Sequence, residues 1–366
     1  MKLAFVTTNL RGGGAEKAVV KLASALSARG HEVHLLLLEN VIEHPVEGSF
    51  QVHALSRPGK SVPKGYLGKR LAAWRLARLY RGLERDASFD MTVATLPFAD
   101  EVVALARLPR VWHRIANTLS AEVAALQQQN PRKAARRLAR YRGLYEGRNL
   151  IAVSEGVAAD LREHLQLRRA NIVRIYNLYD VAGIRRLAEA SEAEIPQQAY
   201  VLHVGRFVRQ KRHDLLFAAF QTLPPSFKLV LLTHPSAALD DMLIAAGIKG
   251  RTIVAGFREN PYPWMRHATL LVLCSDHEGL PNVLIESMIC GTPVVSTDCP
   301  SGPREILDGD LRRFLVPCDD PIALAQAMRD ALDAKPVFGE KVFAKFAAEN
   351  VLQQYETLPQ RWQQAA

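Results

Sequence analysis

The sequence has few cysteines and no long hydrophobic run. All four cysteines lie in the C-terminal half, and no two of them form a C-x-x-C pair. This spacing does not support a zinc site, and a disulfide framework is typical of much smaller secreted domains. The apolar runs, such as HLLLL at 34–38, are far shorter than the roughly 20 residues that a membrane-spanning helix needs. We therefore expect no metal site, and we expect any contact with a membrane to be peripheral.

The sequence shows no sign of export or disorder. Its N-terminal stretch MKLAFVTTNLRGGG runs into arginine and glycines without a secretory cleavage pattern, so we expect a first strand there and a cytoplasmic protein. A composition of 48% hydrophobic and 23% charged residues, with no low-complexity tract, is typical of a globular protein. A length of 366 residues predicts two domains.

Acidic residues are scarce in the first half of the chain. Residues 1–180 carry 28 Lys and Arg against 16 Asp and Glu, whereas residues 181–366 carry 19 against 21. The net charge of +10 therefore comes entirely from the first half of the chain. It predicts a surface that meets polyanions, either nucleic acid or acidic lipid headgroups. A role in solubility alone is the other interpretation.

Short strand-like runs alternate with helical patterns along the chain, which predicts an α/β protein built from βαβ units with parallel sheets. In the first half, strands are predicted at 3–7, 32–38, 91–95 and 149–153, with helices at 16–29, 66–85 and 131–145. The pattern restarts after the polar stretch SEAEIPQQ, with strands predicted at 200–205, 228–233, 252–255, 268–274 and 293–297.

These patterns predict two Rossmann-like, doubly wound domains that face a cleft, because such sheets bind ligands beyond the carboxyl ends of their strands. The predicted boundaries are an N-terminal domain at 1–180, a linker at 181–198, a C-terminal domain at 199–342 and a final helix at 343–366 that packs back on the first domain.

The first strand is followed by the glycine turn NLRGGGAEK. Gly12, Gly13 and Gly14 would let the backbone approach a ligand closely and would leave N–H groups at a helix N-terminus facing an anion. A dinucleotide fingerprint would need G-x-G-x-x-G, and its last glycine is replaced by Lys17, so NAD binding is disfavoured. A plain tight turn is the alternative.

The second domain opens with HVGRFVRQKRHD, where Arg206 and Lys211 lie five positions apart across a turn. Two cations that converge on a strand end suit a diphosphate, since Arg binds through its planar fork and Lys as a point charge. Taken alone the pair is weak support, because most such pairs are simply solvated.

Two glutamates flank a Gly-Leu-Pro-Asn turn in CSDHEGLPNVLIESMICGTPVVST. Glu278 is predicted in the loop after a buried strand, and Glu286 about one turn into the helix that follows, so both can face one ligand edge. The N–H groups of Asn282 and Val283 would face a bound phosphate, and Pro281 suits the first helical position. Without further context, the two carboxylates could also be a general acid and base.

Several of these stretches resemble the retaining glycosyltransferases of family four, which have the GT-B fold. The residues that carry the resemblance are GRF with Lys211, the stretch SDHEGLPNVLIESMICGTPVVSTDCPSGPREIL, the turn GGGAEK, the segment VSEGVAADL at 153–161 and the ending QYETL. The resemblance runs over nearly the whole chain. The resemblance implies an enzyme that takes a sugar from a nucleoside-diphosphate donor, and it implies an acceptor-side first domain and a donor-binding second domain.

The resemblance also implies roles for single residues. Glu286 would hold the ribose hydroxyls, and Glu278 would line the donor sugar together with the amides of Gly279 and Leu280. Arg206 and Lys211 would neutralise the diphosphate, and the amide of Gly14 would approach it. Cations and amides could then stabilise the leaving group with no metal and no cofactor. The two-carboxylate glycosidase scheme is disfavoured for Glu278 and Glu286.

Two departures from the family leave parts of the site open. Family members often place a histidine near the donor sugar, and His113 in VWHRIANTLS is the only candidate here, although a packed or surface histidine fits equally well. The stretch LLTHPSA at 231–237 stands where the family usually has a glycine-rich turn.

The helical pattern at 66–85 has an apolar core side and a second side on which apolar residues precede arginines. Trp74, Arg78, Arg81 and Arg85 lie on this second side and suit an anionic bilayer surface. We expect the first domain to dock on the inner face of the cytoplasmic membrane and to take a lipid-linked acceptor. A helix that is buried on both sides is the alternative.

The favoured function is therefore transfer from a UDP-sugar in the synthesis of bacterial surface polysaccharide or lipopolysaccharide, by a hexosyl- or N-acetylhexosaminyltransferase. A soluble GT-B enzyme with a small acceptor is the second hypothesis. A nucleic-acid-binding protein is the third, and we disfavour it because only the pI of 9.6 speaks for it and no recognition motif does.

Overall fold

The computed structural model describes residues 1–11, 13–43 and 48–363, and these residues form two compact units. Unit 1 contains Met1–Leu178 and Ala348–Ala366, and unit 2 contains Tyr179–Ala347. The second unit thus begins just before the predicted linker, and the helix α7 (Val181–Leu187) occupies part of that segment. Phe343 and Phe346, predicted in the last helix, are buried residues of unit 2.

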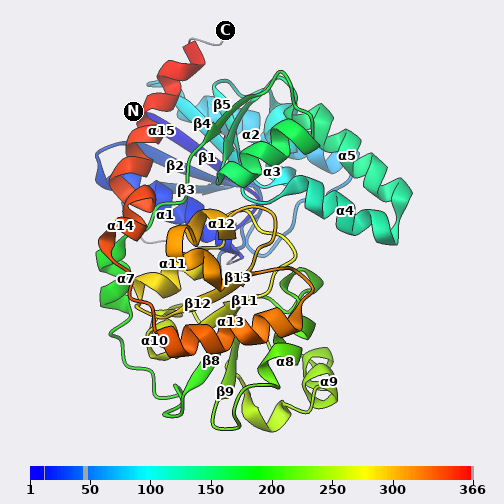
Figure 1. Cartoon of the computed structure of the whole chain (residues 1–366). Coiled ribbons are helices and arrows are strands. Elements are labelled where there is room, and N and C mark those ends of the chain that lie inside the picture. The colour runs from blue at the N-terminus through cyan, green and yellow to red at the C-terminus, as the bar shows by residue number, and fades with distance from the viewer. Residues whose placement is uncertain (12, 44–47, 364–366) are drawn as a thin grey trace. The chain divides into compact units, whose positions relative to one another are not determined.

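Unit 1 is built on a parallel sheet with the strand order β3-β2-β1-β4-β5-β6-β7 (Figure 1). Its strands are β1 (Lys2–Thr7), β2 (Glu32–Leu37), β3 (Gln51–Ala54), β4 (Met91–Thr95), β5 (Val111–Ile115), β6 (Asn149–Ala152) and β7 (Asn171–Arg174). Its helices are α1 (Gly14–Ala28), α2 (Tyr66–Leu83), α3 (Pro97–Ala106), α4 (Leu119–Gln129), α5 (Pro131–Tyr145), α6 (Glu155–Ala159) and α15 (Ala348–Gln363).

Both faces of this sheet are buried, which explains why β1 is buried along its whole length and is apolar from Leu3 to Val6. Leu3 and Phe5 point into a core that α1 and α15 cover, whereas Ala4 and Val6 point into a core that α2 and α3 cover. The C-terminal helix α15 lies along α1, and its Tyr355 is fully buried there (Figure 1). The last helix is therefore part of the core of unit 1.

Unit 2 repeats the same architecture with the strand order β10-β9-β8-β11-β12-β13, again with every pair parallel. Its strands are β8 (Tyr200–Val204), β9 (Lys228–Leu232), β10 (Thr252–Val254), β11 (Leu270–Leu273), β12 (Val294–Thr297) and β13 (Leu315–Val316). Besides α7, its helices are α8 (His213–Phe220), α9 (Ala237–Ala245), α10 (Tyr262–His267), α11 (Asn282–Ile289), α12 (Pro303–Ile306), α13 (Pro321–Ala334) and α14 (Glu340–Phe343).

The prediction of two doubly wound parallel sheets is confirmed. In both sheets the order of the strands reverses beside the first strand, and ligands of such sheets bind at the carboxyl ends of the strands next to this point. In unit 2 the reversal lies between β8 and β11, which are the strands that precede Lys211 and Glu278.

Candidate active site

The candidate site of unit 2 starts at the carboxyl end of β8. The chain leaves the strand at Gly205, passes the exposed Arg206 and makes one short 3-10 turn at Arg209–Lys211 before α8 begins. A Cβ atom at Gly205 would lie 3.4 Å from His203 Nε2 and 3.6 Å from the side chain of Lys211. The turn therefore lies close to the end of the strand, with the side chain of Lys211 folded over it.

Lys211 forms an ion pair with Glu278, which follows the neighbouring strand β11. The distance between Lys211 Nζ and Glu278 Oε1 is 2.5 Å, and the two side chains are only 18% and 12% exposed. A nearly buried ion pair holds both side chains in one geometry, because breaking it would leave an uncompensated charge in a region of low polarity. The predicted phosphate-binding cation and the predicted sugar-binding carboxylate are thus direct partners in the folded chain.

Further hydrogen bonds fix the turn after β8 to the loop after β11. Gln210 Nε2 donates to the carbonyl of His277 at 2.6 Å, and the amide of Asp276 donates to the carbonyl of Gln210 at 2.8 Å. Arg212 also binds the carboxylate of Asp276, at 3.0 Å. The two loops therefore form one rigid body around the pair of Lys211 and Glu278.

Glu286 lies on the buried side of α11, and it is as little exposed as Glu278, at 9% for each residue. The hydroxyl of Tyr262 donates a hydrogen bond to Glu286 Oε1 at 3.2 Å. Burial of most of α11 fixes its orientation, so Glu286 is presented from a rigid helix rather than from a loop. A carboxylate in such a place can accept further hydrogen bonds, as the two hydroxyls of a ribose would supply.

The segment Gly279–Asn282 connects the two glutamates, and it is packed from behind by Gly302. Gly302 has a φ of +95°, and a Cβ atom there would come within 2.5 Å of Pro281 Cδ and 2.9 Å of the carbonyl of Gly279. Only glycine fits both conditions. The prediction that Pro281 is the first helical residue of α11 is wrong. Its ψ of 95° is extended, so Pro281 is the N-cap and the helix starts at Asn282.

Two buried histidines form the floor beneath Lys211. The rings of His203 and His213 lie 4.7 Å apart, and His203 Nδ1 hydrogen-bonds the carbonyl of Val272 at 2.9 Å. Burial lowers the pKa of His203 to about 4, because its effect outweighs the opposing hydrogen bond to Val272, and the nearby Lys211 adds a smaller lowering. Burial, His203 and Lys211 lower the pKa of His213 to about 3. Both rings are neutral at pH 7, so Lys211 carries the positive charge of this layer.

Comparison with known protein families agrees with this geometry. Residues 12–182 match the model described as Glycosyltransferase Family 4, and residues 198–334 match the model described as Glycosyl transferases group 1. The second match contains Arg206, Lys211, Glu278 and Glu286.

The chain is a family-four glycosyltransferase.

Relatives of this glycosyltransferase support the same family. A Campylobacter jejuni protein named N-acetylgalactosamine-N,N'-diacetylbacillosaminyl-diphospho-undecaprenol 4-alpha-N-acetylgalactosaminyltransferase is 28% identical over 339 residues, which are 91% of this chain and 90% of the relative. The lipopolysaccharide core biosynthesis glycosyltransferase LpsD of Rhizobium meliloti is 25% identical over 344 residues, which are 91% of this chain and 88% of the relative.

Solved structures identify the fold as GT-B. A sucrose-phosphate synthase from Thermosynechococcus elongatus matches with a TM-score of 0.78 at 20% identity, over 100% of both chains. The Anabaena protein HepE in complex with UDP and glucose matches with a TM-score of 0.73 at 18% identity, over 98% of this chain and 99% of that one. The prediction of a GT-B fold with two Rossmann-like domains is therefore confirmed.

The first-domain candidates of the glycosyltransferase lie on two different parts of unit 1. Gly13 is the N-cap of α1 and Gly14 its first residue, at the carboxyl end of β1, whereas Gly12 lies outside the described residues. His113 lies inside β5 and is fully buried, with its Nδ1 at 2.8 Å from Asp100 Oδ1. Tyr145 donates to the other oxygen of Asp100 at 2.7 Å. This environment favours the alternative of a packed histidine, and we assign no catalytic role to His113.

The outer side of α2 is exposed, so the alternative prediction of a helix buried on both sides is wrong. Leu67 is 79% exposed and Trp74 is 55% exposed, and Arg78 lies over the Trp74 ring at 5.9 Å from its centroid.

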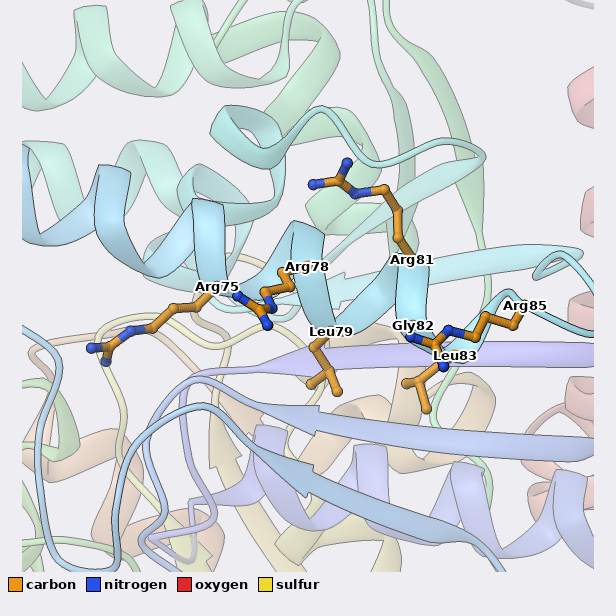
Figure 2. Close-up of a pocket in the computed structure, with 7 residues that line it drawn as sticks. All are labelled: Arg75, Arg78, Leu79, Arg81, Gly82, Leu83 and Arg85. Carbon is orange, nitrogen blue, oxygen red and sulfur yellow. The ribbon is translucent and has the colours of Figure 1, made fainter.

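Farther along α2 is a cavity of about 700 Å³ (Figure 2). In Figure 2, Leu79 and Leu83 point toward the strands, whereas Arg81 projects from the opposite side of the helix. The cavity is lined by Arg75, Arg78, Leu79, Arg81, Gly82, Leu83 and Arg85.

Sequence reasoning missed several residues that shape the candidate site of unit 2. Tyr262, Gln210 and Gly302 were not singled out, although each contacts a predicted site residue or its loop. The signal for Gly302 was present, because glycine between serine and proline in CPSGP is typical of a turn with positive φ. No comparable signal marks Tyr262 or Gln210, whose partners are known only once the loops are folded.

Proposed function

We propose that this chain is a retaining glycosyltransferase that moves a sugar from a UDP-sugar to a lipid-linked or lipopolysaccharide-type glycan. The observation that carries the proposal is the arrangement of Lys211, Glu278 and Glu286 at the carboxyl edge of the unit 2 sheet, within the stretch that matches the glycosyltransferase model. The names of the Campylobacter and Rhizobium relatives support the acceptor class, and the name of the HepE complex supports UDP.

In this proposal the donor lies along the edge from β8 to α11. Arg206 and Lys211 face the diphosphate, and the amides of Asn282 and Val283, at the start of α11, add to the positive field there. Glu286 holds the ribose hydroxyls from its rigid helix. Glu278 frames the sugar together with the backbone of Gly279 and Leu280. Lys211 and Glu286 are then held in place before the donor binds, whereas Arg206 is exposed.

The reaction breaks the bond between the anomeric carbon of the sugar and the diphosphate oxygen, and it forms a bond from that carbon to the acceptor oxygen on the same face. The proton of the acceptor hydroxyl passes to a donor phosphate oxygen. Negative charge grows on the leaving diphosphate during this step, so cations fixed in advance stabilise the transition state more than the ground state. We propose that Arg206 and Lys211 do this without a metal, and that Glu278 is not a nucleophile.

A donor panel tests the proposal directly. Turnover is measured as nucleotide released from UDP-glucose, UDP-galactose, UDP-N-acetylglucosamine and UDP-N-acetylgalactosamine, with the ADP- and GDP-sugars as controls. We expect release from a UDP-sugar, an unchanged anomeric configuration in the product and a higher melting temperature with UDP. The proposal is overturned if no nucleoside diphosphate raises the melting temperature of the protein.

We also propose that α2 docks unit 1 on an anionic membrane surface. None of the helices in the described ranges is both long and apolar enough to cross a bilayer, so only a surface contact is considered. Along the exposed side of α2, the apolar Leu67, Leu71 and Trp74 precede Arg78 and Arg81. Apolar side chains can enter the interface while arginines reach the headgroups, which is how amphipathic helices bind anionic bilayers.

Sedimentation with vesicles tests the docking. The test variant carries W74S, R78Q, R81Q and R85Q, and its matched control carries R162Q, R168Q and R169Q, which remove equal charge from exposed residues elsewhere in unit 1. We expect the test variant alone to lose binding to vesicles with anionic lipid, by about tenfold or more. Equal binding of the two variants would refute a specific role for α2.

A further inference from the structure

A second cavity of unit 1, of about 330 Å³, lies between the loop that follows β3 and the first half of α2. It is distinct from the arginine cavity at the end of α2, and the two share only Arg75. Because β2 and β3 end at Leu37 and Ala54, this cavity lies at the carboxyl edge of the sheet, where doubly wound sheets bind ligands. It is lined by Leu55, Ser56, Arg57, Lys60, Ser61, Val62, Pro63, Gly68, Leu71, Ala72 and Arg75.

A tight turn brings two of the cations of this cavity together. Arg57, Pro58, Gly59 and Lys60 form a β-turn in which the amide of Lys60 donates to the carbonyl of Arg57 at 3.1 Å. Gly59 has a φ of +71°, and a type II turn requires a positive φ at its third position. Pro58 occupies the second position, where proline is favoured. The turn places the Cα atoms of Arg57 and Lys60 within about 7 Å of each other. Two cations therefore stand on one rim of the cavity.

The loop that carries this turn is held firmly by hydrogen bonds to the sheet edge. The hydroxyl of Ser56 accepts from the amide of Asn40 at 2.8 Å and donates to the carbonyl of Lys60 at 2.7 Å. The buried carboxylate of Glu39 accepts from Asn9 Nδ2 at 2.7 Å and from the amide of Val62 at 3.1 Å. The cavity is therefore a built feature of the sheet edge and not a gap beneath a loose loop.

The third cation, Arg75, comes from α2, on the other wall of the cavity. Between the walls lie apolar side chains, among them Val62 and Leu71. In the described part of the chain, Arg57, Lys60 and Arg75 form no ion pair with an acidic residue. Like charges held together without a counter-charge repel one another, so the arrangement gains stability when an anion binds.

We propose that this cavity binds a phosphate group of the acceptor, with the apolar side chains in contact with the part of the acceptor next to that phosphate. Two arginines and a lysine suit phosphate, because guanidinium groups bind its oxygens in pairs and the ammonium group adds a point charge. The inference rests on the proposed function and narrows the acceptor class to phosphate-bearing molecules. The phosphate can belong to a lipid diphosphate or to a phosphorylated glycan.

Calorimetric titration of the full-length protein tests this proposal, with saturating UDP present so that the donor site is occupied. The probes are farnesyl diphosphate, inorganic diphosphate and farnesol. The test variant is R57Q, K60Q and R75Q, and the matched control is K64Q, R70Q and R132Q, which changes the charge equally at exposed residues that do not line the cavity. We expect the test variant alone to lose affinity for diphosphates by about tenfold or more.

The probes separate the two sources of the phosphate. Tighter binding of farnesyl diphosphate than of inorganic diphosphate indicates a lipid-linked acceptor, and equal binding indicates a phosphorylated glycan. The inference is overturned if no diphosphate binds beside UDP, or if the test variant binds as well as the control. Failure of UDP itself to bind in the same experiment would instead count against the proposed function.

Discussion

The two units treat their cations in opposite ways. In unit 2, Lys211 and Arg212 at the edge of the sheet are held by Glu278 and Asp276, at 2.5 Å and 3.0 Å. In unit 1, the basic residues that line the two cavities along α2 form no ion pair within the described ranges. Paired cations are fixed in position before a ligand arrives, whereas unpaired ones depend on the ligand for neutralisation.

This difference fits the division of labour that we propose. Stabilising a transition state needs cations that do not have to reorganise during the reaction, and pairing with Glu278 provides that for Lys211. Capturing an anionic acceptor or a membrane surface needs an attractive field that extends into solvent, and unpaired cations provide that. The need for such a field explains the excess of basic residues over acidic ones in the first half of the sequence, 28 against 16.

Replacing Lys211 by Met should have the largest effect, because it removes a cation from the proposed donor edge and breaks the nearly buried ion pair with Glu278. We expect turnover to fall by about 10²–10³-fold. We also expect the free energy of unfolding to fall by about 2–4 kcal/mol. Nucleotide release and thermal unfolding measure the two losses.

The matched control for this change is K249M, which removes a lysine from the pair of Lys249 and Asp240, where both side chains are 47% exposed. Its loss should stay within about 1 kcal/mol, since exposed ion pairs contribute little. If both variants lose similar stability and activity, the contrast between buried and exposed pairs has no functional meaning.

Replacing Glu286 by Gln should separate the two glutamates of the donor side. A ribose-holding carboxylate contributes to binding in the ground state and the transition state alike, so we expect the affinity for UDP to fall about tenfold with a smaller change in kcat. E278Q should show the reverse, with lower kcat and nearly unchanged UDP affinity. Calorimetry with UDP and initial rates distinguish them, and Y262F should give a weaker form of the E286Q effect. Identical kinetic profiles for E278Q and E286Q would contradict separate roles.

Ionic strength should act differently on the two units. Raising the salt concentration from low to several hundred millimolar should weaken binding to anionic vesicles by about tenfold or more, since the arginines of α2 are exposed and screened. The affinity for UDP should change by less than about threefold, since salt screens partly buried charges much less. Co-sedimentation and calorimetry over the same salt series measure both. Parallel salt dependence would show that the donor edge is as open as α2.

Most of the fold could be predicted from the sequence, but β3, β5, β7 and β13 were not, and the three of unit 1 were missed for two different physical reasons. β3 and β7 are the two edge strands of the unit 1 sheet, and edge strands need no apolar run because one side of each meets solvent. β5 reads VWHRI, and its His113 and Arg114 are buried. They are accommodated by hydrogen bonds to Asp100 and Asn177. Hydrophobic patterning cannot anticipate partners so distant in the chain.

The candidate site residues of unit 2 were predicted from a local motif, but the ion pair between Lys211 and Glu278 was not. Glu278 and Lys211 are separated by 67 positions, and each was assigned to a ligand group rather than to the other. The resemblance to the family predicts which residue types stand at which spacing within one short loop and the start of one helix. It could not show that the two loops are fixed to each other by Gln210, because that contact depends on the order of β8 and β11 in the sheet.

The smallest predicted effect is a loss of stability at low pH, and it arises from two buried histidines of unit 2. The pKa of His213 is about 3 and that of His203 about 4 in the folded chain, against an ordinary value of 6.5. As the pH falls below 6.5, the unfolded chain therefore binds protons that the folded chain does not, and the free energy of unfolding decreases until the pH reaches the folded values. H213F removes one of these groups from a site lined by Phe207 and Phe217. The melting temperature of H213F should consequently fall less between pH 7 and pH 5 than that of the unmodified protein. An unaltered slope in H213F would mean that this ring takes up its proton without unfolding, and that the layer beneath Lys211 can open in the native state.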